Sequence, residues 1–203
     1  MNEIRTILST SKWILLSAAV LAVSTQTGRA QLISLPPIPS KLKVQAGNQL
    51  FLKASAIGTQ NYLCLASGWT FIGPQATLSV TLPWITGTIQ QQVATHYLTP
   101  NPFEESTNRP LWQSSLDTSI VWGKQVDFSD DAAYVQPNAI PWLLLQAAGN
   151  QKGPTGGSML SQTTFIQRIN TTGGMKPATA CTVGAREFVP YTADYIFYRK
   201  AGN

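Results

Sequence analysis

The chain of 203 residues is weakly charged, which excludes several kinds of protein before any motif is considered. Charged residues make up only 11% of it, hydrophobic residues 43%, and the net charge is +5. Because the basic residues are scattered singly and no heptad pattern occurs, the composition indicates neither a nucleic-acid-binding surface nor a coiled coil.

The first 30 residues have the pattern of a secretory signal peptide. Arg5 and Lys12 precede an apolar run over residues 13–23, and small residues flank a cleavage point after Ala30. The apolar run is shorter than the about 20 residues that a membrane-spanning helix needs. We therefore expect a secreted protein, extracellular or periplasmic, without a membrane span after cleavage. An uncleaved N-terminal anchor is the alternative.

Loss of this leader would leave 203 − 30 = 173 residues, enough for one domain with an adequate core. Residues 31–45 contain closely spaced prolines and predict an extended lead-in. Residues 46–203 are predicted to form a single β-rich domain, which we expect to be monomeric.

Strand patterns recur along this domain in chain order. Alternating or β-branched and aromatic residues occupy 50–56, 61–65, 69–71, 76–82, 93–97, 120–126, 163–169 and 191–198. Turn residues separate these segments, and no repeat of about 20 to 50 residues is visible. The pattern predicts an all-β fold, an antiparallel β-sandwich or barrel-like single domain with long loops.

Two segments depart from this pattern. Residues 93–112 begin as a strand ending at His96 and Tyr97, then carry three prolines, which predicts a long loop of a functional or mobile kind. Residues 140–148 are apolar and fit either a short helix or a strand buried on both faces, and we favour the strand.

Cys64 and Cys181 are the two cysteines of the chain. In an exported protein a single disulfide between them is the default expectation, and two separate buried thiols are the alternative. The bridge would join early chain to late chain across 117 residues.

Several strings resemble one known family in their order. They include ASAIGTQNYLC from Ala54, Pro110-Leu111-Trp112, FIQRINTTGG from Phe165 and VPYTADYIFY from Val189. Together they resemble a family of secreted bacterial and fungal proteins, named for a domain of unknown function 3455, over residues 46–198. The resemblance implies export, one β-rich domain and a Cys64–Cys181 bridge, and it implies no reaction. The chain differs by a longer 98–109 connection and by Thr118 where a glycine is typical.

Catalytic motifs are sparse, so an enzyme is not the favoured interpretation. His96 is the only histidine, which excludes a His-pair metal site, and we expect no metal or other cofactor. No G-x-S-x-G motif places a nucleophile beside it. Four carboxylates form the adjacent pairs Glu104-Glu105 and Asp130-Asp131, of a kind typical of solvated turns, and the others lie apart.

A ligand site, if present, is expected around His96, Trp112, Asp117 and Ser119. Trp112 follows the proline-containing segment, and it is the tryptophan we expect to be partly exposed. A Trp beside polar groups would suit a glycan or another small ligand, because sugar rings stack on aromatic faces.

Arg168 and Asp194 each interrupt a predicted apolar strand. Because an unpaired charge in such a place is costly, we predict that they form a supporting ion pair. Asn170 begins an N-glycosylation sequon, which matters only in a eukaryotic host.

These observations favour an exported binding or surface-interaction module whose partner is an extracellular glycan or a small ligand. A hydrolase acting on an extracellular polymer and a structural surface protein without a ligand site are the alternatives. Paired carboxylates across a groove would favour the hydrolase, and a largely apolar groove would favour the binding module.

Overall fold

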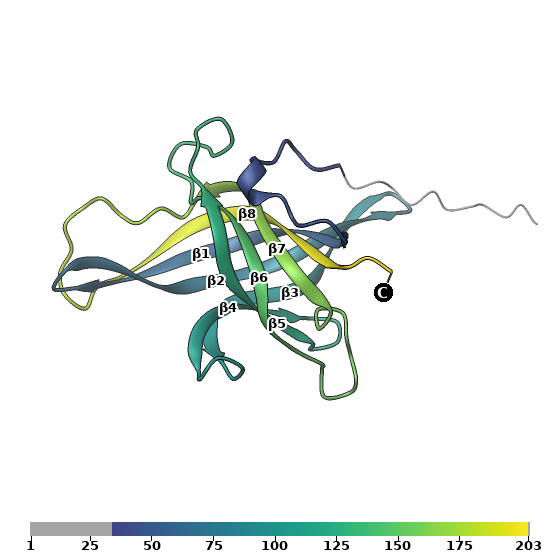
Figure 1. Ribbon diagram of the computed structural model, residues 1–203. Coiled ribbons are helices and arrows are strands. Elements are labelled where there is room, and N and C mark those ends of the chain that lie inside the picture. The colour runs from purple at the N-terminus through teal and green to yellow at the C-terminus, as the bar shows by residue number, and fades with distance from the viewer. Residues whose placement is uncertain (1–33, 203) are drawn as a thin grey trace, which may run out of the picture. The chain divides into compact units, whose positions relative to one another are not determined.

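A computed structural model describes residues 34–202, in which eight β-strands form one closed antiparallel barrel (Figure 1). The predicted signal peptide, residues 1–30, lies outside the described residues. The strands are β1 (Asn48–Leu65), β2 (Gly68–Trp84), β3 (Gly87–Asn101), β4 (Thr107–Ser114), β5 (Ile120–Ser129), β6 (Trp142–Gln151), β7 (Thr163–Gly173) and β8 (Arg186–Lys200).

Each strand pairs with its neighbours in the chain, and β8 returns to pair with β1 along most of its length. The prediction of an all-β antiparallel fold is confirmed, and of the two architectures it allowed the protein has the barrel. The apolar segment 140–148 lies mostly in β6, as favoured. Register shifts interrupt several strand pairs, for example at Asn61 and at Leu78, and such bulges bend strands so that a sheet can close.

The barrel interior combines small residues on some strands with large ones on others. Ala54 and Ala56 of β1 and Ala193 of β8 face inward, and this leaves room for Trp112 and Tyr195. Closure places inward-facing and outward-facing residues alternately along each strand. The interior is therefore a packed core over part of its length.

The outer face of β6, β7 and β8 is also buried. The segment before β1, including the short 3-10 helix η1 (Ser40–Leu42), packs on it together with the connection between β5 and β6. Leu42 is fully buried there, and Gln167 of β7 donates a hydrogen bond to its carbonyl oxygen over 2.6 Å. Apolar layers on both sides explain why β6 reads as a continuous apolar run without a clear alternation.

The prediction of a long loop over residues 98–109 is wrong for most of these residues, which lie in strands. β3 continues to Asn101 and β4 begins at Thr107, so the connection covers only 102–106. Pro100 and Pro110 lie on these strands where each is paired on one side only. A proline is tolerated at such edges because its missing N–H faces no partner strand.

The predicted disulfide joins Cys64, at the end of β1, to Cys181 in the connection between β7 and β8. That connection covers residues 174–185 and lies beside the β1–β2 turn, at the left of Figure 1. The bridge therefore fixes this long connection to its neighbouring hairpin.

Removing the bridge in a Cys64→Ser, Cys181→Ser double variant should lower the free energy of unfolding by about 2 to 5 kcal/mol, because the unfolded chain regains the freedom of a 117-residue loop. Urea unfolding of the oxidised wild type, the reduced wild type and the variant measures this loss. The reduced wild type should match the variant. Equal midpoints for all three would contradict a stabilising role.

Candidate functional site

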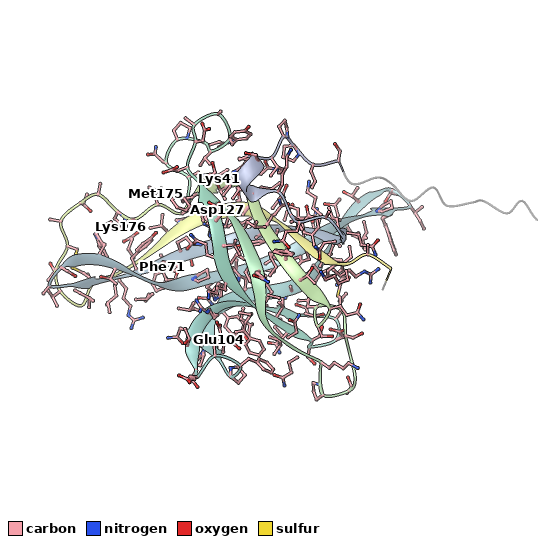
Figure 2. The ribbon with its side chains drawn as sticks, viewed as in Figure 1. Lys41, Phe71, Glu104, Asp127, Met175 and Lys176 are labelled. Carbon is pink, nitrogen blue, oxygen red and sulfur yellow. A yellow bond between two sulfur atoms is a disulfide. The ribbon has the colours of Figure 1, made fainter. Side chains whose placement is uncertain are left out.

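A cavity of about 480 Å³ opens into the barrel from one end. In an up-and-down barrel successive connections alternate between the two ends, so the β1–β2, β3–β4, β5–β6 and β7–β8 connections share one end. The cavity lies toward that end, which we call the mouth. Most of its walls are apolar, and the larger apolar and aromatic residues among them include Tyr62, Phe71, Leu98, Phe128, Leu143 and Leu145. Figure 2 shows Phe71 on the β1–β2 side of this end.

Two of the predicted site residues, His96 and Trp112, meet in the wall of the cavity. They are register partners on β3 and β4, and their rings stack with centroids 4.3 Å apart and planes 8° apart. Trp112 is only 1% exposed, so the expectation of a partly exposed side chain is wrong. The strand that replaces the expected loop turns this residue inward.

His96 is held neutral. Its Nδ1 lies 2.8 Å from the Leu111 carbonyl oxygen, and because a carbonyl can only accept, Nδ1 carries the proton. The pKa of His96 is lowered to about 3, mainly by burial; the Leu111 hydrogen bond raises it and the nearby Arg168 guanidinium lowers it. At neutral pH this imidazole is uncharged, and it is too weak a base for efficient proton abstraction.

The charge in the cavity belongs to Arg168 of β7. Its Nη2 and Nε donate to the Pro141 carbonyl oxygen over 2.9 and 3.3 Å. The guanidinium also lies near the hydroxyl groups of Tyr191 and Tyr195, whose pKa values are raised by burial and lowered by the arginine. Within residues 34–202 no carboxylate forms an ion pair with Arg168.

The predicted Arg168–Asp194 ion pair does not form. Arg168 is the register partner of Tyr195 and faces inward, whereas Asp194 is the partner of Ile169 and faces outward. Asp194 instead contacts Lys53 over 3.3 Å and accepts hydrogen bonds from Ser55 and Asn170. The Asn170 side chain is thus held beside β8.

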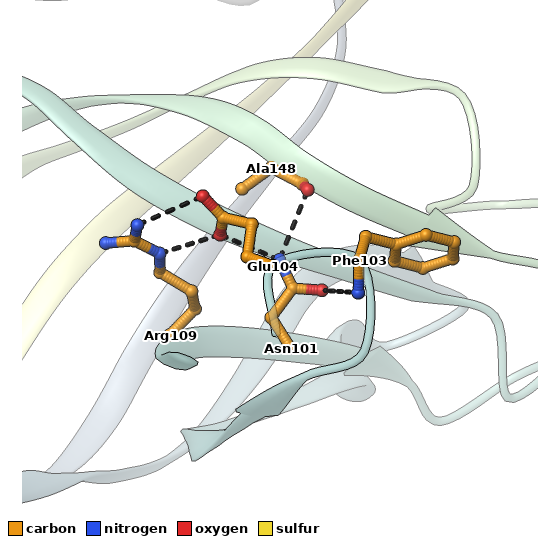
Figure 3. Close-up of polar contacts among 5 residues, drawn as sticks. All are labelled: Asn101, Phe103, Glu104, Arg109 and Ala148. Carbon is orange, nitrogen blue, oxygen red and sulfur yellow. Dashed lines mark hydrogen bonds and ion pairs between the residues drawn. The ribbon is translucent and has the colours of Figure 1, made fainter. Parts of the chain in front are cut away.

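A second arginine stands at the mouth but is neutralised. Arg109 donates to both carboxylate oxygens of Glu104, over 2.8 and 3.0 Å (Figure 3). Asn101 holds this connection in place by donating to Glu104 and to the Ala148 carbonyl oxygen. Hydrogen bonds from Arg109 and Asn101 lower the pKa of Glu104 to about 2, so the pair stays ionised at neutral pH.

Two buried N–H groups among the lining residues lack a partner. Gln60 Nε2 and Trp112 Nε1 make no hydrogen bond within the described part of the chain, although Gln60 lies next to the Tyr191 hydroxyl. Buried donors are usually satisfied, so unpaired ones in a cavity wall indicate where a bound molecule or water could accept.

The other two predicted site residues, Asp117 and Ser119, lie in the β4–β5 turn at the opposite end and do not line the cavity. Asp117 accepts hydrogen bonds from the Ser119 hydroxyl and from the Met159 backbone N–H, over 2.6 and 2.8 Å. Ser119 in turn accepts from the Leu160 N–H. Burial opposes ionisation of Asp117, but these hydrogen bonds and one from Ser114 outweigh it and lower its pKa to about 2. The pair fastens the β6–β7 connection to the turn.

Sequence reasoning missed most of the cavity wall. Gln60, Tyr62 and Tyr195 were not predicted as site residues, although each lies in or beside a segment with strand alternation. Whether a residue lies inside the barrel depends on which face of its strand turns inward. The bulges in β1 and β2 change that face between the two halves of each strand, so alternation alone does not show it.

No group of three or more His, Cys, Asp or Glu side chains in residues 34–202 is placed to hold a metal ion. The helical turn η1 covers three residues, and the described part of the chain contains no helix that could traverse a bilayer.

Because His96 is neutral in the folded protein, the free energy of unfolding should depend on pH. The unfolded histidine has a pKa near 6.5 and the folded one about 3, so below pH 6.5 only the unfolded chain takes up the proton. Stability should therefore be complete above pH 6.5 and fall by about 2 kcal/mol between pH 7 and 5. Urea unfolding at several pH values measures this slope.

A His96→Phe variant is the control for that slope. It should be less stable than the wild type at pH 7, because the Leu111 carbonyl loses its donor. Its stability should nevertheless change little between pH 7 and 5, since the chain has no other histidine. An unchanged slope in the variant would contradict the assignment.

Asp117→Ala and Ser119→Ala should each lower the free energy of unfolding by about 1 to 3 kcal/mol, because each leaves a backbone N–H of the 159–160 segment without its acceptor. Thermal unfolding measures the effect. Ser115→Ala, an exposed serine of the same turn, is the control and should change little. Wild-type stability in the first two variants would mean that these residues do not fasten the turn.

Comparison with known proteins gives a family but no activity. A family model described as "Protein of unknown function (DUF3455)" matches residues 45–199. No curated protein and no solved structure matches the chain significantly. Since the match covers most of the chain, including all but the last residue of the barrel, the protein belongs to the DUF3455 family.

Proposed function

We propose that this protein is a binding module that takes one small organic molecule into its barrel. The observation that carries the proposal is the cavity of about 480 Å³, apolar over most of its wall and open at one end. Small-molecule sites are typically concave spaces of about 300 to 1,000 Å³ with a few polar groups in apolar walls. Barrels of eight strands are just wide enough to hold one such ligand.

The lining residues favour binding over catalysis. Hydrolysis of a polymer would call for paired carboxylates, and no Asp or Glu of the described chain lines the cavity. His96 is buried and neutral, and no serine or cysteine stands beside it in the wall. Apolar side chains, including Leu160 and Phe197, occupy the rest of the interior, which leaves no path for an extended polymer.

The setting in which the ligand would be met is outside the cytoplasm. The N-terminal 30 residues have the composition of a secretory leader, and the disulfide between Cys64 and Cys181 fits an oxidising compartment. We infer secretion from these two features, with the barrel acting as the soluble carrier or sensor of its ligand.

Filling the cavity should abolish binding. Leu143 faces inward on β6 and lines the cavity, so a Leu143→Trp variant places a larger side chain in the space that a ligand would take. N-Phenyl-1-naphthylamine, an uncharged probe that fluoresces in apolar surroundings, should bind the wild type at a single site and lose at least about tenfold in affinity in this variant. Fluorescence titration measures both constants.

Val126→Trp is the matched control, because Val126 is exposed on β5 and does not line the cavity. Its affinity for the probe should equal that of the wild type. Circular dichroism and thermal unfolding of both variants would establish that the barrel persists. Failure of the wild type to bind this or any other small apolar probe, or equal binding by Leu143→Trp, would overturn the proposal.

A further inference from the structure

The cavity has an unbalanced charge. Arg168 is half-buried in its wall, and within residues 34–202 no carboxylate pairs with it. Two of its N–H groups donate to the Pro141 carbonyl oxygen, and a guanidinium has five such donors in a fixed fork. The Tyr195 hydroxyl is within hydrogen-bonding reach of the guanidinium as well. Both partners are neutral groups, so the positive charge of Arg168 has no counter-ion within residues 34–202.

Neighbouring groups leave that charge in place. His96 is neutral, and the tyrosine hydroxyls beside the guanidinium keep their protons because burial raises their pKa values. Arg109 at the mouth is already paired with Glu104 through two hydrogen bonds. The net charge that a molecule meets inside the cavity is therefore that of Arg168 alone.

The unpaired polar atoms of the wall are also of one kind. Gln60 Nε2 and Trp112 Nε1 are buried N–H donors without a partner, and Gln60 is only 3% exposed. Together with the guanidinium they offer donors and a positive charge to a molecule that can only accept. The wall also holds acceptors, such as Nε2 of the neutral His96, but the guanidinium charge favours an anion over a neutral ligand such as a sugar.

We propose that the ligand of this barrel is an organic carboxylate whose acid group pairs with Arg168 and whose ring-bearing apolar body fills the space between β2, β5 and β6. This inference rests on the proposed binding function. A carboxylate matches the planar fork of arginine in two parallel hydrogen bonds. One uncompensated cation balances a single negative charge, which favours a monocarboxylate over a phosphate dianion. Phe71, Phe128 and Leu143 supply the apolar contact.

Two ligands of the same shape, one charged and one neutral, test whether the positive charge of Arg168 contributes to binding. Titration calorimetry compares 2-naphthoate with 2-naphthamide, which has the same ring and no charge. The wild type should bind the carboxylate at least about tenfold more tightly than the amide, because charge-assisted hydrogen bonds are the stronger kind. In Arg168→Gln this preference should disappear through loss of naphthoate affinity, while naphthamide affinity stays within about threefold of the wild type.

Two further variants sharpen the result. Arg168→Lys keeps the charge and loses the fork, so its preference for naphthoate should lie between those of the wild type and Arg168→Gln. Lys152→Gln removes one exposed positive charge from the β6–β7 connection, at the end away from the mouth, and should leave both affinities unchanged. Should Arg168→Gln fail to fold, the wild-type ratio and Arg168→Lys still decide the question.

Equal binding of the two probes by the wild type would overturn the carboxylate assignment while leaving the binding function in place. The same holds if Arg168→Gln retains the wild-type preference. Absence of binding by naphthoate, naphthamide and N-phenyl-1-naphthylamine together would instead remove the binding function itself.

Discussion

Closure of β8 onto β1 is the constraint on which the rest of the structure depends. It gives every strand two partners and divides the side chains into an inner and an outer set. The space inside the barrel therefore depends on how many of the inward-facing residues are small. Alanines on β1 and β8 make space, and Trp112 and Tyr195 occupy part of it. The part they do not occupy becomes the cavity. Its position at one end follows from packing, because large apolar residues fill the other half.

A second layer gives the cavity wall its rigidity. The segment around Leu42 and the β5–β6 connection cover β6, β7 and β8 from outside, so β7 is held between two apolar clusters. Its inward residue Arg168 is fixed further by two hydrogen bonds to the Pro141 carbonyl, which belongs to that same connection. The outer layer therefore positions the charged group of the inner cavity. At the mouth, the disulfide and the Asn101–Glu104–Arg109 contacts hold two more connections in the same way.

Much of the fold could be predicted from the sequence, because alternation and turn residues are local properties. Most of the strands follow from such patterns, whereas the strand over 140–148 follows from its apolar run and the disulfide from two cysteines in a chain with a predicted leader. The site could not be predicted, since alternation shows which residues share a face but not which face is inside. Arg168 and Asp194 have this ambiguity: each interrupts an apolar strand, yet the register places one inside and one outside. The prediction that Trp112 is partly exposed was wrong for a related reason. It took the nearby prolines to mark a loop, but prolines also occur in a strand that is paired on one side only.

The buried polar groups of the barrel differ in whether their hydrogen bonds and charges are satisfied within the protein. Asp117 and Ser119 are polar and partly or fully buried. Their hydrogen bonds close the β4–β5 turn or fasten the β6–β7 connection to it, so these side chains serve the fold. Gln60 and Arg168 lie toward the mouth and differ, because one has an unpaired donor and the other a charge without a counter-ion. Such groups lower stability and persist where something other than folding uses them. The unpaired donor of Gln60 and the charge of Arg168 therefore support the proposed ligand site at the open end of the barrel.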